Sequence, residues 1–246
     1  MIEINIFETK EEMGKEAAKK AIKILKNALK INRKAYFIAA TGTSQFEFLH
    51  NLTHQRGIEW DKTEMFHLDE YIGLSANNSA SFRKYLKERI VDIVQPSKVH
   101  FIKGDATDPI MECKRLNKLI SKKEIDVAFI GIGQNGHIAF NDPPANFEIK
   151  DPYIIVHLDE TCRNQQVNEG WFKSIEDVPK KAITMSIQEI LRAKNIICIC
   201  PDERKAEAVR NCLSDDNKVT PIYPASILKT HKNVFCYLDK FSSSLL

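Results

Sequence analysis

Short apolar runs alternate with longer amphipathic segments along the 246 residues of this chain. In the amphipathic segments, apolar side chains recur every three or four positions, which is the spacing of one helix face. Helices are therefore expected at residues 11–29, 46–52, 79–94, 186–192 and 202–213. The apolar runs predict strands at residues 35–40, 126–132, 153–158, 195–200 and 233–238, and one more in the segment EMFHLDEY, residues 64–71.

Strands that alternate with helices along a chain are typical of α/β proteins. Because the crossover helices pack on both faces of the sheet, its strands pair mostly in parallel. No segment has the composition of a linker, and a length of 246 residues is common for one such domain. We therefore predict a single α/β domain over residues 1–246, with a mostly parallel sheet and helices on both faces.

The charge balance gives no sign of a polyanionic partner. Lys and Arg number 36 against 33 Asp and Glu, so the formal net charge is only +3, too small for a nucleic-acid surface. No apolar stretch approaches the roughly 20 residues of a membrane span. The first residues, MIEINIFETKEEM, lack the layout of a secretory signal. We expect neither nucleic acid nor a membrane as a partner, whereas a small anionic substrate needs only a local positive patch.

Six cysteines in a chain without a secretory signal indicate reduced thiols and a cytoplasmic protein. Cys198 and Cys200 alternate in the run IICIC, which places both on one face of a strand. A metal site or a redox pair is one interpretation of this spacing. We favour two buried thiols, because small apolar thiols are common in strand interiors.

Ligands of open α/β sheets bind beyond the carboxyl ends of the strands, so the turns after the predicted strands are candidate sites. The first is TGTS, which consists of Thr41, Gly42, Thr43 and Ser44. It opens a helix and offers free backbone N–H groups, a positive dipole end and three hydroxyls, all of which suit a phosphate. Its spacing is not that of a nucleotide P-loop. A plain helix N-cap explains the same residues equally well.

The second turn begins in HLDEYIGL, residues 67–74, where two carboxylates interrupt an apolar strand end. Neighbouring side chains of an extended backbone point to opposite faces, so Asp69 and Glu70 cannot both face one pocket. One of them can act as a base while the other makes structural bonds. Without further context, an ordinary polar loop start is the better explanation.

The third turn, GIGQNGHIAFNDPPANF, is the most informative of the three. Its glycines, Gly133 and Gly136 among them, let the backbone approach a ligand closely. His137 emerges from these glycines, and Asn135 and Asp142 are near enough in sequence to orient its ring. A lone histidine is usually structural, but this one follows a glycine run at the expected ligand edge of the sheet. We therefore interpret His137 as a functional residue.

Five blocks of the sequence resemble the glucosamine-6-phosphate deaminase (isomerase) family in their order and spacing. They are LDEYIGL, GIGxNGHIAFND, VPKKAITMSI, KAEAV and PASILKTH, and the resemblance runs over nearly the whole chain. It implies a Rossmann-like sheet and the conversion of glucosamine 6-phosphate and water to fructose 6-phosphate and ammonia, a step of amino-sugar catabolism. It also implies that no metal, nucleotide or other cofactor takes part.

The resemblance further implies roles for individual residues. Asp69 matches the base that moves a proton between the C2 and C1 carbons, and His137 matches the histidine that opens the sugar ring. Asn135 and Asp142 occupy the places of the two carboxyl-bearing residues that orient this histidine. The TGTS turn matches the sugar-phosphate loop, and Lys205 matches a lysine that contacts the phosphate.

Several positions depart from the family pattern. The phosphate loop, commonly TGGTP, reads TGTSQ here, Asn135 stands where many members have Asp, and Asp142 replaces the usual Glu. The arginine that clamps the phosphate is missing from the segment TCRNQQVNEGWF, in which Arg163 is the candidate substitute. These departures bear on the identity of the amino-sugar phosphate more than on the type of reaction.

Two other functions fit the same residues. A 6-phosphogluconolactonase-like hydrolase resembles this family in fold and in its use of an acidic residue and a histidine. A catalytically silent sugar-phosphate-binding protein would keep the fold and tolerate the altered phosphate loop, but the retention of Asp69, His137 and Lys205 argues against it. The expected partner is in each case a small sugar phosphate. The sequence leaves open whether the protein forms a homo-oligomer.

Overall fold

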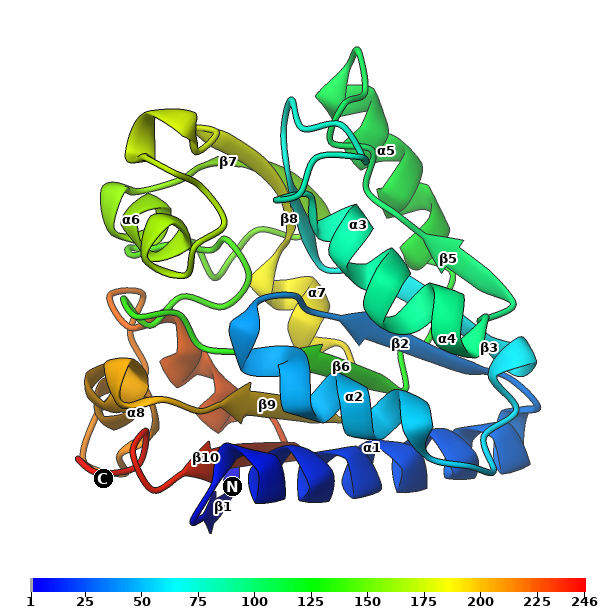
Figure 1. The fold of residues 1–246 in the computed structure, drawn as a ribbon, viewed down its shortest axis with the longest axis horizontal. Helices are drawn as coiled ribbons and strands as arrows, with labels where there is room; N and C mark the ends of the chain where they lie inside the picture. The colour runs from blue at the N-terminus through cyan, green and yellow to red at the C-terminus, as the bar shows by residue number, and fades with distance from the viewer. Residues whose placement is uncertain (1) are drawn as a thin grey trace.

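A seven-stranded parallel sheet forms the centre of the computed structural model, which describes residues 2–246 (Figure 1). Its strands lie in the order β1 (Ile2–Phe7), β10 (Val234–Asp239), β9 (Ile196–Cys200), β6 (Val127–Ile130), β2 (Ala35–Ala39), β3 (Thr63–His67) and β5 (Lys98–His100). Every pairing between these strands is parallel. The mostly parallel sheet is confirmed, although the apolar pattern does not predict the two edge strands, β1 and β5.

Helices cover both faces of this sheet, as predicted. One face carries α1 (Lys10–Asn32), α2 (Phe46–His54) and a helical segment made of α3 (Phe82–Leu86), a π-helical turn (Lys87–Val91) and α4 (Asp92–Val94). The other face carries α5 (Pro109–Ile120), α7 (Ile187–Leu191) and α8 (Ala206–Leu213). Successive strand residues alternate between the two apolar layers, as Phe37 and Ile38 do. Within residues 2–246, no helix is long and apolar enough to cross a membrane.

A second, antiparallel sheet consists of β4 (Asp69–Tyr71), β8 (Lys181–Met185) and β7 (Tyr153–His157). The single strand predicted for residues 64–71 is therefore wrong, because the chain leaves the parallel sheet at Leu68. The backbone N–H of Leu68 donates to the Ala39 carbonyl at 3.3 Å, in the parallel sheet. Its carbonyl accepts from the N–H of Met185 at 2.9 Å, in the second sheet. Leu68 thus joins the two sheets.

Three interior elements, α5, β8 and α6 (Glu160–Asn168), are also missing from the sequence-based prediction. The sequence of α6 is ETCRNQQVN, whose few apolar residues form no stripe toward the core. The carboxylate of Asp159 instead caps the first turn by accepting from the backbone N–H of Cys162. A helix held in this way by its cap and its neighbours is not found by a search for apolar periodicity.

The helices α1 and α2 approach each other closely at Gly14. A Cβ atom built on Gly14 would lie 2.7 Å from the Cβ of Glu47 and 2.8 Å from the backbone N of Phe48. Gly14 is buried inside α1, where alanine would otherwise favour the helix. The missing side chain is therefore a requirement of the packing between the two helices.

We predict that Gly14→Ala lowers the free energy of unfolding by about 2 kcal/mol, because the added methyl group meets backbone atoms that cannot rotate away. Lys23→Ala, on the exposed side of the same helix, is the control and should change this free energy by less than about 0.5 kcal/mol. Urea unfolding followed by circular dichroism gives both values. A Gly14→Ala variant as stable as the original protein would show that the two helices separate without cost.

Candidate active site

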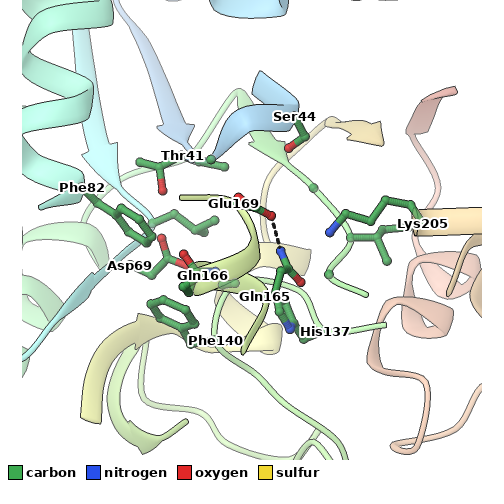
Figure 2. Close-up of a pocket in the computed structure, with 17 residues that line it drawn as sticks. Thr41, Ser44, Asp69, Phe82, His137, Phe140, Gln165, Gln166, Glu169 and Lys205 are labelled. Atoms are coloured by element: carbon green, nitrogen blue, oxygen red, sulfur yellow. Dashed lines mark hydrogen bonds between the residues drawn. The ribbon is translucent and has the colours of Figure 1, made fainter. Parts of the chain in front are cut away.

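A pocket opens at the carboxyl ends of β2, β3, β6 and β9, and it holds about 550 Å³ of empty space, part of it open to solvent. The three turns singled out in the sequence meet there (Figure 2). The first turn contributes Thr41, Gly42 and Ser44, the second contributes Asp69, and the third contributes Gly133 and His137. The pocket therefore lies where ligands of open α/β sheets bind.

Asp69 is the first residue of β4, and its side chain points into the pocket (Figure 2). The residue is only 6% exposed. Within residues 2–246, no side chain or backbone group donates a hydrogen bond to its carboxylate. Burial, with a smaller contribution from the charge of Glu70, raises the pKa of Asp69 to about 8. A carboxyl group that titrates near neutral pH and has no partner is suited to exchange protons with a substrate.

Glu70 points away from the pocket and is fully buried. Its carboxylate accepts hydrogen bonds from the backbone N–H groups of Tyr71, Phe82 and Arg83 and from the hydroxyl of Ser81. These bonds fasten the start of α3 to β4. The two neighbouring carboxylates thus divide as the alternation of an extended backbone predicts, with one facing the pocket and the other holding the structure together.

The ring of His137 lies directly against the backbone of Gly133. A Cβ atom built on Gly133 would lie 2.2 Å from Nε2 and 2.4 Å from Nδ1 of the ring. The Nδ1 atom is 3.0 Å from Oδ1 of Asp142, a contact that is not aligned as a hydrogen bond. Because Nδ1 faces Asp142, the Nε2 atom is the ring nitrogen left for a ligand. Asp142 is therefore placed to balance the charge of an imidazolium.

Asn135 shapes the loop around His137 without contacting the imidazole ring. Its Oδ1 accepts from the backbone N–H of His137 at 3.1 Å. Its Nδ2 donates to Asp142 at 3.1 Å and to Asp159 at 3.0 Å. The backbone N–H of Asp159 also donates to Asp142 at 3.1 Å. Burial opposes the ionisation of Asp142, but His137 and these donors outweigh it and hold the pKa of Asp142 below its usual range.

Cys162, which the sequence did not single out, lies behind this pair. The thiol of Cys162, a ring nitrogen of His137 and a carboxylate oxygen of Asp142 lie within 4.8 Å of one another. Within residues 2–246, this group could hold a metal ion. Its carboxylate, however, already accepts from Asn135 and Asp159, and burial raises the pKa of the thiol well above its ordinary value. The arrangement therefore suits the orientation of His137 better than the binding of a cation.

The other end of the pocket suits an anion. Gly42 has a φ of +98°, a conformation that favours glycine, and the hydroxyl of Tyr85 donates to its carbonyl at 2.8 Å. Lys205, in the turn between β9 and α8, is 6% exposed and lines the pocket. Its ammonium has no ion-pair partner within the described part of the chain, and burial lowers the pKa of Lys205. A buried, unpaired cation beside a hydroxyl-bearing loop suits the binding of a phosphate.

Five of the sequence-predicted residues do not line this pocket, and two of them, Asn135 and Asp142, lie behind His137 as described above. Thr43 lines an adjoining groove instead. Gly136 packs against Cys212, and its carbonyl accepts from the backbone N–H of Ala225. Arg163 is a correction: its guanidinium donates to the carbonyls of two residues after α6, Ile175 and Val178, so it holds the chain and does not substitute for a phosphate clamp.

The structure adds pocket residues that the sequence did not reveal, and five of them have aromatic, amide or carboxylate side chains. They are Phe82, Phe140, Gln165, Gln166 and Glu169. The last three come from α6 and the residue after it, in the segment TCRNQQVNEGWF that departs from the family pattern. The departure from the family pattern marks this segment in the sequence. It does not indicate what the residues do, because their side chains reach the pocket only through the position of α6.

A buried carboxyl group without a hydrogen-bond partner, a histidine and a buried lysine around one pocket are typical of enzymes that move protons on small anionic substrates. The chain belongs to the family described as glucosamine-6-phosphate isomerases/6-phosphogluconolactonase, whose family model matches residues 8–236. It is 33% identical to a glucosamine-6-phosphate deaminase of Clostridium acetobutylicum, over 94% of this chain and 96% of that protein. It is 35% identical to a glucosamine-6-phosphate deaminase of Shouchella clausii, over 98% of this chain and 97% of that protein.

Solved structures agree with this assignment. A structure described as a monomeric glucosamine-6-phosphate deaminase matches with a TM-score of 0.91 and 32% identity, over 100% of both chains. A 6-phosphogluconolactonase from Trypanosoma brucei matches with a TM-score of 0.81 over 100% of this chain and 99% of that chain, but its 18% identity shows the fold alone. The predicted family and the Rossmann-like fold are confirmed.

We predict that Gly133→Ala lowers kcat at least about a hundredfold, because the methyl group would displace the ring of His137 by more than an ångström. The control is Gly73→Ala, since a Cβ atom built on Gly73 meets nothing within 4 Å although its backbone is strained for alanine. Steady-state kinetics and thermal unfolding of both variants separate the loss of activity from the loss of fold. Full activity in a folded Gly133→Ala variant would show that the ring position is unimportant.

Proposed function

We propose that this protein converts glucosamine 6-phosphate and water to fructose 6-phosphate and ammonia. The observation that carries the proposal is the unpartnered carboxyl group of Asp69, which shares one pocket with His137 and Lys205 (Figure 2). The names of the relatives support the choice of substrate. In the proposed complex, Lys205 and the loop at Gly42 bind the phosphate, which places the sugar carbons toward the other two residues.

The first chemical step opens the sugar ring. Nε2 of His137 takes the proton of the anomeric hydroxyl and then delivers it to the ring oxygen as the bond between C1 and this oxygen breaks. The resulting imidazolium is balanced by Asp142 at 3.0 Å. Asn135 is neutral and bonds the loop backbone, so Asp142 alone supplies this charge.

The second step moves a proton between adjacent carbons. Asp69 as a carboxylate removes the proton from C2 while the carbonyl oxygen at C1 takes a proton from water, which gives an enolamine. The same oxygen of Asp69 then returns its proton to C1 as the nitrogen gives one up to water, which leaves an imine at C2. Water then adds to the imine and ammonia leaves, which gives the ketose. A strand-end carboxylate suits this task because it is held in place, and its pKa of about 8 lets it both take and return a proton near neutral pH.

The proposal extends to the conditions of the reaction. The carboxyl group moves the carbon-bound proton and the imidazole opens the ring, so the reaction is proposed to proceed without a metal ion, as an isomerising hydrolysis of the amino group. The six free, buried cysteines fit a reducing cytoplasmic setting. The solved relative is described as monomeric, and we propose no assembly for this chain beyond the single subunit that contains the whole pocket.

A substrate panel tests the function. Glucosamine 6-phosphate should yield equal amounts of ammonia and ketose phosphate, while other amino-sugar phosphates react more slowly and 6-phosphogluconolactone is not opened. Lactone opening without ammonia release would establish the 6-phosphogluconolactonase-like alternative. Binding of sugar phosphate without any turnover would establish the catalytically silent alternative.

Asp69→Asn should lower turnover at least about a hundredfold and abolish solvent-deuterium exchange at C1 of fructose 6-phosphate, because the amide cannot accept a proton from carbon. Nuclear magnetic resonance of fructose 6-phosphate incubated in D₂O measures the exchange. Asp61→Asn, an exposed aspartate outside the pocket, is the control and should exchange as the original protein does. Continued exchange in a folded Asp69→Asn variant would place the base elsewhere.

A further inference from the structure

The pocket contains a carboxylate for which the proposed reaction has no use. Glu169 follows the last residue of α6 and lines the pocket together with Ser44 and Lys205. Figure 2 shows its side chain reaching into the space between these residues. Its Oε2 atom lies 4.0 Å from the Cβ position built on Gly42, at the backbone of the phosphate loop. A negative charge therefore stands at the end of the pocket that suits a phosphate.

Two neutral donors hold this carboxylate in place. Nε2 of Gln165 donates to Oε1 of Glu169 at 2.7 Å, and Nε1 of Trp171 donates to Oε2 at 3.3 Å. No ion pair joins Glu169 to Lys205 within residues 2–246, although the charge of Glu169 partly opposes the lowering of the Lys205 pKa by burial. The carboxylate of Glu169 and the ammonium of Lys205 thus line the same space without pairing with each other.

The surroundings of Glu169 allow its carboxylate to leave the pocket. The residue is half-buried, and it also lines the adjoining groove. Arg204 lines that groove, and the charge of Glu169 acts on it there. The next residue, Gly170, has a φ of +81° and nothing within 4 Å of a built Cβ atom. A turn of the side chain toward the groove brings the carboxylate near Arg204, whose guanidinium also contacts Asp202 at 2.8 Å.

We propose that Glu169 is a specificity-determining gate of the phosphate subsite. Its carboxylate faces Lys205 across the empty pocket without pairing with it, and an incoming phosphate has to displace this carboxylate toward the adjoining groove. The identity of the phosphorylated substrate rests on the proposed function, but the competition between a carboxylate and a phosphate for one subsite does not. Like charges in a buried site repel strongly, so the displacement weakens phosphate binding and favours ligands with enough charge to drive it.

Inorganic phosphate tests the gate without any need for turnover. Glu169→Gln keeps the size of the side chain and one oxygen, which can accept from Gln165 in place of Oε1, but it removes the charge. We expect its Kd for inorganic phosphate, measured by isothermal titration calorimetry, to be about tenfold lower than that of the original protein. Glu160→Gln, at the exposed start of the same helix, changes the net charge equally and should leave the Kd unchanged.

An equal Kd in the original protein and Glu169→Gln, weaker binding in this variant, or no binding in either would overturn the gate. An equal gain in Glu160→Gln would overturn it too, because the effect would then come from net charge alone. Thermal unfolding verifies that each variant is folded, and Glu169→Ala serves if the glutamine variant is not. Tighter phosphate binding in a protein that does not turn over glucosamine 6-phosphate would refute the proposed function and leave the gate standing.

Discussion

The site depends on one residue at which the chain changes sheets. The N–H of Leu68 belongs to the parallel sheet and its carbonyl belongs to the antiparallel one. Because both groups are bonded, the next residue starts β4 at a fixed height and in a fixed orientation. Asp69 is thereby buried at the wall of the pocket with no hydrogen bond to its carboxylate within residues 2–246, while Glu70 receives four donors on the opposite side. Two adjacent carboxylates acquire different chemistry from the geometry of this junction alone.

The remainder of the pocket depends on where the neighbouring turns place their charged side chains. The third turn packs His137 on Gly133 and sets Asp142 behind the ring, so that one nitrogen stays free. The first turn and Lys205 leave a cation unpaired at the other end. The groups suited to proton transfer and to anion binding thus lie at different ends of one cavity, which Gln165 of α6 and the following Glu169 also line.

Much of this arrangement is predictable from the sequence because it is local. Apolar runs locate the central strands, the alternation of an extended backbone divides Asp69 from Glu70, and turns after parallel strands meet at one edge. The features that the sequence does not predict depend on contacts between distant parts of the chain. The break at Leu68 depends on hydrogen bonds to residues 29 and 117 positions away in opposite directions along the chain. The sequence could not show whether Arg163 binds the phosphate or where Glu169 lies, because both depend on the position of the polar helix α6.

The proposed chemistry depends most on Asp69, a buried carboxyl group without a hydrogen-bond partner whose pKa lies near neutral pH. A ¹³C resonance titration of the aspartate carboxyl groups, with the Asp69 signal assigned by its loss in Asp69→Asn, measures this directly. The account predicts a midpoint near pH 8 in the free enzyme, with the protonated form present below it. A midpoint near pH 4, the ordinary value for aspartate, would show that the carboxyl group is hydrated or paired, and would contradict the account.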